Sequence, residues 1–245
     1  MVPAMIGRLL AAVLFLACVF APAANAQPTA RKAQVVVELF TSQGCTQCPR
    51  ANRLLGMFSR EDGVLALTFP VGIWDYLGWR DTLAQPAFGD RQRAYSQTLH
   101  VRGRFTPQLV FNGANQISAS YWDEARAAIE QAHASPISEW PPFSLSRLPS
   151  NRVRVAIGRG SRRADADIWL VAFDPGPVAV YITRGVNVNR RVYHYNLVRT
   201  IDRIGGWNGE PVYYERSRCT PECAVIVQEP NGGRILAAAF TSHER

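Results

Sequence analysis

Two cysteines in the stretch FTSQGCTQCPR, residues 40–50, have the type and spacing to do chemistry. Cys45 and Cys48 are separated by two residues, and Pro49 follows at once. Such a pair can cycle between dithiol and disulfide, supply two thiolates to a metal site, or form a permanent structural disulfide. The stretch alone leaves all three interpretations open, so the compartment and the neighbouring elements must decide between them.

The residues on either side of the pair predict a strand that passes into a helix. The apolar, β-branched run AQVVVELF (33–40) is typical of a buried strand. Within residues 48–61, Leu54, Leu55 and Phe58 recur at helical spacing, and a proline is tolerated in a first helical turn. The amides and macrodipole of a helix N-terminus stabilise an anion, so a thiolate placed there attacks disulfides at neutral pH. This position favours the redox interpretation.

The rest of the first half alternates between strand and helix patterns. Residues 63–74 predict a second strand, residues 85–99 a helix, and residues 101–120 two strands joined by a turn at Asn112-Gly113. A last helix follows over residues 120–133, with Ser120 expected as its N-cap and acidic residues in its first turn. The predicted order is therefore strand, helix, strand, helix, strand, strand, helix.

This order resembles the thioredoxin fold over residues 34–134, because the cysteine pair follows the first strand and Thr106-Pro107 precedes the third. In that fold the proline is cis and faces the dithiol, a placed feature since cis X-Pro bonds are uncommon. The resemblance implies that Cys45 is the nucleophile, that Cys48 resolves the mixed disulfide, and that Thr106 and Pro107 line a groove for an extended peptide. The alternative is that Pro107 is a plain loop proline.

A closer resemblance is to the secreted thioredoxin-like family called domain of unknown function 1223. It rests on VVELFTSQGCTQCP, IWDYLGWRDTLAQPAFGDRQRAY and TPQLVFNG, and it runs through most of the chain after the leader. The family implies the fold but no settled substrate.

Glu38 lies inside the first strand, seven residues before Cys45. Thioredoxins carry a buried acid near this place that serves proton transfer at the inner cysteine, so the resemblance makes Glu38 a candidate general acid–base. The alternative is a strand acid that points to solvent or pairs with an arginine. The mixed cluster of Trp74, Asp75, Tyr76, Trp79, Arg80 and Asp81 follows a strand end, and we expect it in the core rather than at the rim of the groove.

The second half has a different pattern of residue types. Prolines interrupt HASPISEWPPFSL, which predicts a linker over residues 135–143. From residue 144 to 245, short strand-like runs alternate with Gly, Pro, Asn and Asp, and helical periodicity is weak. We therefore expect an α/β thioredoxin-like domain followed by a small all-β, sandwich-like C-terminal domain.

Residues 1–26 have the layout of a secretory signal peptide: Arg8, an apolar run, and the small-residue site Ala24-Asn25-Ala26. We expect cleavage after Ala26 and a bacterial protein that is periplasmic or secreted, with no stable membrane span afterwards. An uncleaved anchor and a lipid on Cys18 are the alternatives.

Four cysteines remain after the leader, and an oxidising compartment allows them to form disulfides. For Cys219 and Cys223 we expect a local structural disulfide. The alternatives are a second redox pair that exchanges with Cys45–Cys48, or a four-cysteine zinc site made from both pairs.

The formal net charge is +8, but the arginines are scattered and no aromatic-and-basic motif accompanies them, which argues against a nucleic-acid partner. The sequence thus predicts an exported thiol–disulfide oxidoreductase. It would act on protein or peptide thiols and disulfides, exchange electrons with a redox partner protein, and need no bound cofactor or metal. The alternative from another class is a non-catalytic binding module with a structural disulfide. A metal-handling protein is a third reading.

Overall fold

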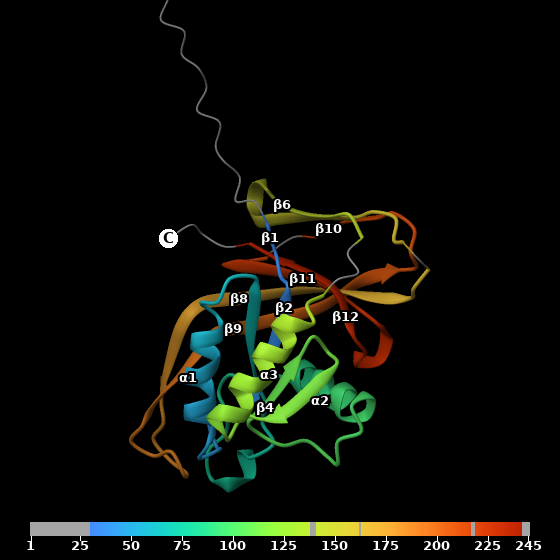
Figure 1. Ribbon diagram of the computed structural model, residues 1–245. Coiled ribbons are helices and arrows are strands. Elements are labelled where there is room, and N and C mark those ends of the chain that lie inside the picture. The colour runs from blue at the N-terminus through green and yellow to red at the C-terminus, as the bar shows by residue number, and fades with distance from the viewer. Residues whose placement is uncertain (1–29, 138–140, 162, 217–218, 242–245) are drawn as a thin grey trace, which may run out of the picture.

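The helices and strands predicted for the first half form in the predicted order. The computed structural model describes residues 30–137, 141–161, 163–216 and 219–241 (Figure 1). This half contains β1 (Arg31–Lys32), β2 (Val35–Thr41), α1 (Cys48–Phe58), β3 (Val64–Pro70), the 3-10 turn η1 (Asp75–Leu77), α2 (Pro86–Thr98), β4 (Gln108–Phe111), β5 (Asn115–Ser118) and α3 (Trp122–Ala134). The predicted signal peptide, residues 1–26, lies outside the described residues. None of the described helices is long and apolar enough to cross a membrane.

Two local predictions for this half have different outcomes. Asn112 and Gly113 lie in the turn between β4 and β5 with φ of 50° and 62°, the left-handed conformation that a type I′ turn requires at both central residues, and the N–H of Ala114 donates to the carbonyl of Phe111 at 2.9 Å. Ser120 does not cap α3, because the N-cap is Tyr121 and makes no side-chain hydrogen bond. The hydroxyl of Ser120 instead contacts Ser118, at 2.9 Å, and the side chain of Gln47.

The second half is built from strands and short 3-10 turns in the residues that the structure describes. They are β6 (Phe143–Leu148), η2 (Pro149–Asn151), β7 (Arg152–Ile157), β8 (Ala166–Tyr181), β9 (Arg191–Trp207), β10 (Val212–Arg216), β11 (Glu222–Gln228), η3 (Pro230–Gly232) and β12 (Ile235–Phe240). The long strands β8 and β9 form one antiparallel hairpin with several register shifts.

Strands from the two halves share one sheet. Its order among the described strands is β1-β12-β11-β8-β9-β3-β2-β4-β5. The junction is the parallel contact of β3 with β9, where Thr68 is opposite Leu197. Side chains reinforce it: the hydroxyl of Thr68 donates to the carbonyl of Tyr195, and the amide of Asn196 donates to the carbonyl of Ala66 at 2.9 Å. The sequence places the later strands in a unit of their own, whereas four of them extend the sheet of the first half because β9 pairs with β3.

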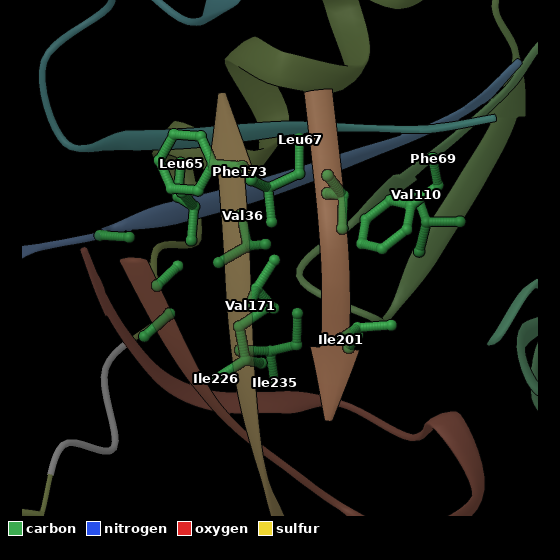
Figure 2. Packing of buried hydrophobic residues seen from close by; sticks show 14 of the residues in the cluster. Val36, Leu65, Leu67, Phe69, Val110, Val171, Phe173, Ile201, Ile226 and Ile235 are labelled. Carbon is green, nitrogen blue, oxygen red and sulfur yellow. The ribbon is translucent and has the colours of Figure 1, made fainter. Parts of the chain in front are cut away.

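Alternation along β2 divides the core into two layers. Val35, Val37 and Leu39 belong to the cluster on the α1 and α3 face, while Val36 and Phe40 belong to the cluster that α2 covers. Figure 2 shows the second cluster, in which Val171 and Phe173 of β8 and Ile201 of β9 lie among Val36, Leu65 and Leu67. Both halves therefore bury apolar surface against each other, and the division into domains at 34–134 and 144–245 stays a prediction.

A second, three-stranded sheet in the order β10-β7-β6 lies against the far part of the large sheet. Val153, Val155 and Ile157 of β7 pack with Ile168 of β8 and Val225 of β11 in a separate apolar cluster. Two antiparallel layers thus face each other in a sandwich-like arrangement. One of these layers is continuous with the sheet of the first half.

Helix α1 touches the β8–β9 hairpin so closely that one glycine is required. A Cβ placed on Gly56 would lie 2.7 Å from ring atoms of Tyr195 in β9. Alanine in a helix interior normally stabilises relative to glycine. Here we expect Gly56→Ala to lower the free energy of unfolding by about 1–3 kcal/mol, because the ring must be displaced. Urea unfolding measures the change.

The matched control is Arg53→Ala, an exposed position on the same helix. It should change the free energy of unfolding by no more than about 0.5 kcal/mol. A stabilising effect of Gly56→Ala would show that β9 does not pack on α1 in this way.

Candidate active site

The cysteine pair lies between the end of β2 and the start of α1. Cys45 and Cys48 are bridged, with Cα atoms 5.4 Å apart, and Cys48 is the first residue of α1. Pro49 occupies the first turn of the helix, where its missing N–H is not needed. Cys48 is fully buried and Cys45 is 7% exposed, so Cys45 is the outer sulfur of the pair.

The carbonyl oxygen of Thr106 lies 3.7 Å from Sγ of Cys45. The Thr106–Pro107 peptide bond is cis, as the sequence predicted. The indole Nε1 of Trp74 donates to Oγ1 of Thr106 at 2.8 Å, which fixes this side of the site from the loop after β3. The structure therefore brings together four of the five predicted site residues: both cysteines, Thr106 and Pro107.

Gln43, two residues before Cys45 and fully buried, connects the dithiol loop to two other parts of the chain. Its backbone N–H donates to Oδ2 of Asp81 at 2.7 Å, and its side-chain Oε1 accepts from Nε1 of Trp79 at 2.8 Å. The amide of Asn187, at the tip of the β8–β9 hairpin, donates to the carbonyls of Gln43 at 2.9 Å and of Cys45 at 2.8 Å. Asn187 is fully buried as well. The loop is thus held by a residue of the second half.

Asp81 is a buried carboxyl beside this loop. Burial raises its pKa to about 6 by removing water from the charged form, while the backbone N–H groups of Gln43 and Leu83 donate to it and oppose the rise. The neighbouring Asp75 adds repulsion and accepts from the N–H of Asp81 at 3.0 Å. The loop that carries the cysteines therefore depends on a carboxyl that titrates in mildly acidic solution.

Glu38 is buried in an ion pair on the α2 side of the sheet. Nε of Arg91 lies 2.7 Å from Oε1 of Glu38, and the hydroxyl of Tyr95 donates to the same carboxylate. Gln228 of β11 donates to the hydroxyl of Tyr95 at 3.0 Å. Burial lowers the pKa of Arg91, but the Glu38 carboxylate outweighs it and leaves that pKa raised. Burial raises the pKa of Tyr95.

Pairing with an arginine is the structural alternative that the sequence left open for Glu38. Its neighbours Val37 and Leu39 face α1, so alternation along β2 turns Glu38 away from the helix that carries Cys48. A role of Glu38 in proton transfer stays a prediction.

The expectation that the aromatic cluster belongs to the core is wrong for part of it. Tyr76 is 75% exposed, and Arg80 is exposed too. Trp74 and Trp79 are half-buried and bond to Thr106 and Gln43. The cluster forms a rim around the dithiol loop because η1 places its side chains at the end of the sheet.

The second cysteine pair is far from this loop and is a local disulfide, as predicted. Cys219 and Cys223 are bridged, with Cα atoms 5.6 Å apart, and both are fully buried in the cluster between the two sheets. Among the described residues, no group of three or more His, Cys, Asp or Glu side chains is arranged to hold a metal ion.

Comparison with protein families gives a match over residues 36–228 to the family described as "Protein of unknown function (DUF1223)". This chain belongs to the DUF1223 family. A segment of 37 residues is 43% identical to a probable thioredoxin of Archaeoglobus fulgidus, covering 15% of this chain and 41% of that relative. The crystal structure of a structural-genomics protein from Agrobacterium tumefaciens superimposes with a TM-score of 0.72 at 25% identity, covering 88% of this chain and 99% of that one.

Sequence reasoning missed Gln43 and Asn187 as parts of the site in this DUF1223 protein. Gln43 is two residues before Cys45, and this closeness to the cysteine motif was the only sequence signal for its role. Asn187 carries no local signal, because its partners lie more than 140 residues earlier in the chain.

We expect Asp81→Asn to change how stability depends on pH. A raised folded pKa means that the native state holds the proton more tightly than the unfolded chain. The contribution of Asp81 is therefore complete below about pH 4 and is lost as the pH rises through about 6, by about 3 kcal/mol in all. Asparagine cannot ionise, so the variant should lose this decline. Urea unfolding between pH 4 and 7 measures it, and parallel profiles for the two proteins would contradict the assignment.

We expect Asn187→Ala to loosen the dithiol loop of this DUF1223 protein. It leaves the buried carbonyls of Gln43 and Cys45 without their donor, which should cost about 1–3 kcal/mol of stability. Amide hydrogen exchange at residues 43–48 should become faster than in the control Val188→Ala, an exposed neighbour on the same hairpin tip. Equal exchange rates in the two variants would show that the hairpin does not hold the loop.

Proposed function

We propose that this protein is an exported thiol–disulfide oxidoreductase built on a thioredoxin-like arrangement of β2, α1, β3, α2, β4, β5 and α3. The observation that carries the proposal is the bridged Cys45–Cys48 pair at the start of α1, with the Thr106 carbonyl 3.7 Å from the outer sulfur. The segmental identity to a probable thioredoxin supports the same chemistry.

The surroundings of Cys45 suit a reactive thiolate. The first turn of α1 contains no acidic residue, so nothing there opposes the partial positive charge of the helix N-terminus. A thiolate is stabilised at such a position and is the attacking species in disulfide exchange. Cys48 is fully buried, so a partner can react with it only after it has reacted with Cys45.

The proposed reaction is a two-step exchange. In the reducing direction the Cys45 thiolate attacks one sulfur of a partner disulfide, and the partner's second sulfur leaves as a thiolate that takes a proton from water. Cys48, as its thiolate, then attacks Sγ of Cys45, which forms the Cys45–Cys48 bond and releases the partner's first sulfur. Two electrons pass from the dithiol to the partner, which ends with two thiols. The reverse sequence forms a disulfide in the partner.

Thr106 and Pro107 have a positioning role in this proposal. Pro107 has no N–H to donate, its carbonyl accepts from the N–H of Ala119 at 3.0 Å, and the Thr106 carbonyl is directed at Cys45. An extended segment of the partner would lie along this backbone and bring its disulfide to the outer sulfur. The exchange needs no bound cofactor, since the partner supplies or accepts both electrons.

Trapping of a mixed disulfide tests the proposal. Cys48→Ser keeps the nucleophile and removes the resolving thiol, so covalent adducts with partner proteins should accumulate in cells and disappear when reductant is added. Cys45→Ser is the matched control and should give none, because the inner thiol is fully buried. Non-reducing gels measure the difference.

The non-catalytic binding module predicts the same gel pattern for both variants, and that result would end the enzyme interpretation. For an active pair, the reduction potential of Cys45–Cys48 sets the direction of electron flow. A value near about −120 mV indicates an oxidant and one near about −270 mV a reductant.

A further inference from the structure

Four exposed arginines at the dithiol end of the molecule form no ion pair with a described acidic residue: Arg80, Arg104, Arg184 and Arg190. We call them the arginine arc. Many arginines elsewhere in the described residues are paired with acids: Arg31, Arg91, Arg93, Arg126, Arg147, Arg152, Arg154, Arg159, Arg199 and Arg203. Other described arginines also form no ion pair with a described acidic residue: Arg50, Arg53, Arg60, Arg102, Arg163, Arg191, Arg216 and Arg234. It is therefore the position of the arc beside the dithiol loop, and not the lack of acidic partners, that indicates a surface for another molecule.

Two arginines of the arc are close in sequence to residues that contact the dithiol loop. Arg80 precedes Asp81, whose carboxylate accepts from Gln43, and Arg104 lies two residues before Thr106. Arg80 and Arg104 also line one hollow of about 340 Å³.

The other two arginines of the arc are on the hairpin tip. Arg184 precedes Gly185, where an added Cβ would lie 3.0 Å from Cβ of Trp79. Nη1 of Arg190 is 3.5 Å from Oδ1 of Asn187, which in turn bonds to the dithiol loop. Figure 1 shows the hairpin tip and the loop that contains η1 at the same end of the molecule as the start of α1.

The acidic residues at this end offset only part of the arc. Asp75, Asp81 and Asp90 line the same hollow as Arg80 and Arg104, whereas the hairpin tip, residues 182–190, carries Arg184 and Arg190 and has no acidic residue in its sequence. The exposed acids Asp123 and Glu124 are in the first turn of α3, which follows Ser120 and so flanks the dithiol loop at Gln47. The loop is therefore bordered by positive charge on the hairpin side, by charges of both signs on the η1 side and by negative charge on the α3 side.

Exposed apolar side chains accompany the arc. Tyr76 is 75% exposed and Leu77 43%, and on the hairpin tip Val186 is 47% and Val188 46% exposed. The two segments touch, since a Cβ on Gly185 would lie 3.6 Å from the carbonyl oxygen of Leu77. Apolar side chains between arginines suit the mixed surface of a polypeptide.

We propose that the arginine arc and these apolar side chains form a docking surface for a polypeptide with acidic residues beside its disulfide or dithiol. This inference rests on the proposed oxidoreductase function and names the class of its partner. Attraction between the arc and the acidic segment would raise the rate of encounter, and the α3 side would repel the same segment and so orient it.

The test uses two synthetic peptides with the same internal disulfide, one flanked by glutamates and the other by lysines. The reduced full-length mature protein should reduce the glutamate peptide about tenfold faster at low ionic strength. At 1 M salt, where the Debye length is about 3 Å, the difference should largely disappear. Stopped-flow measurement of the exchange gives both rate constants.

Charge reversal locates the effect. Arg104→Glu/Arg184→Glu should abolish or invert the preference for the glutamate peptide. Arg60→Glu/Arg234→Glu makes the same change in net charge at exposed positions outside the arc, and it should keep most of the preference. Equal losses in the two double variants would assign the preference to overall charge and overturn the proposal.

A small neutral dipyridyl disulfide separates the docking surface from the chemistry. If it reacts with Cys45 but the two peptides react at equal rates, the docking proposal is wrong and the oxidoreductase stands. If neither the small disulfide nor the peptides react, the proposed function itself fails. Binding of the wild type to phosphatidylglycerol vesicles through the arc, without a peptide preference, would identify the surface as a lipid site and also overturn the proposal.

Discussion

The parallel contact between β3 and β9 is the constraint on which the rest of the structure depends. Without it β3 would be an open sheet edge, and the sheet of the first half would end there. The contact joins the halves and buries Leu197, and the β8–β9 hairpin extends from it to the tip whose Asn187 bonds to the cysteine loop. The same strand brings Tyr195 against Gly56 of α1, so the helix that begins with Cys48 is packed by residues far along the chain.

In this arrangement the two halves of the chain supply different parts of the site. The first half supplies the two sulfurs and the Thr106 carbonyl, all at loops that follow or precede buried strands. The second half supplies Asn187, which satisfies two carbonyls that the turn around Cys45 leaves pointing inward. A bare turn of this shape would bury unpaired acceptors, which is costly. The hairpin tip removes that cost and at the same time adds arginines to the surface around the sulfurs.

Local pattern predicted the first half well because its signals are local. The buried strand before Cys45 and the Asn112-Gly113 turn depend on neighbouring residues, and so does the short Cys219–Cys223 pair of the second half. Strand β9 has a weak signal in the sequence, since Arg199 and Arg203 interrupt its apolar residues and both are partly exposed, as one side of a sheet allows. Its pairing with β3 and the role of Asn187 depend on contacts between residues more than a hundred positions apart. The periodicity of apolar residues in a single sequence gives no information about such contacts.

The distance along the chain between Cys45 and Asn187 has a consequence for biosynthesis. The two are 142 residues apart, and a ribosome adds about 5–20 residues each second. Cys45 therefore exists for roughly 7–28 s before the residue that anchors its loop has been made. Until then the carbonyls of Gln43 and Cys45 lack the amide donor that they have in the folded protein, so the loop around the cysteines is anchored only after about three quarters of the chain has been made.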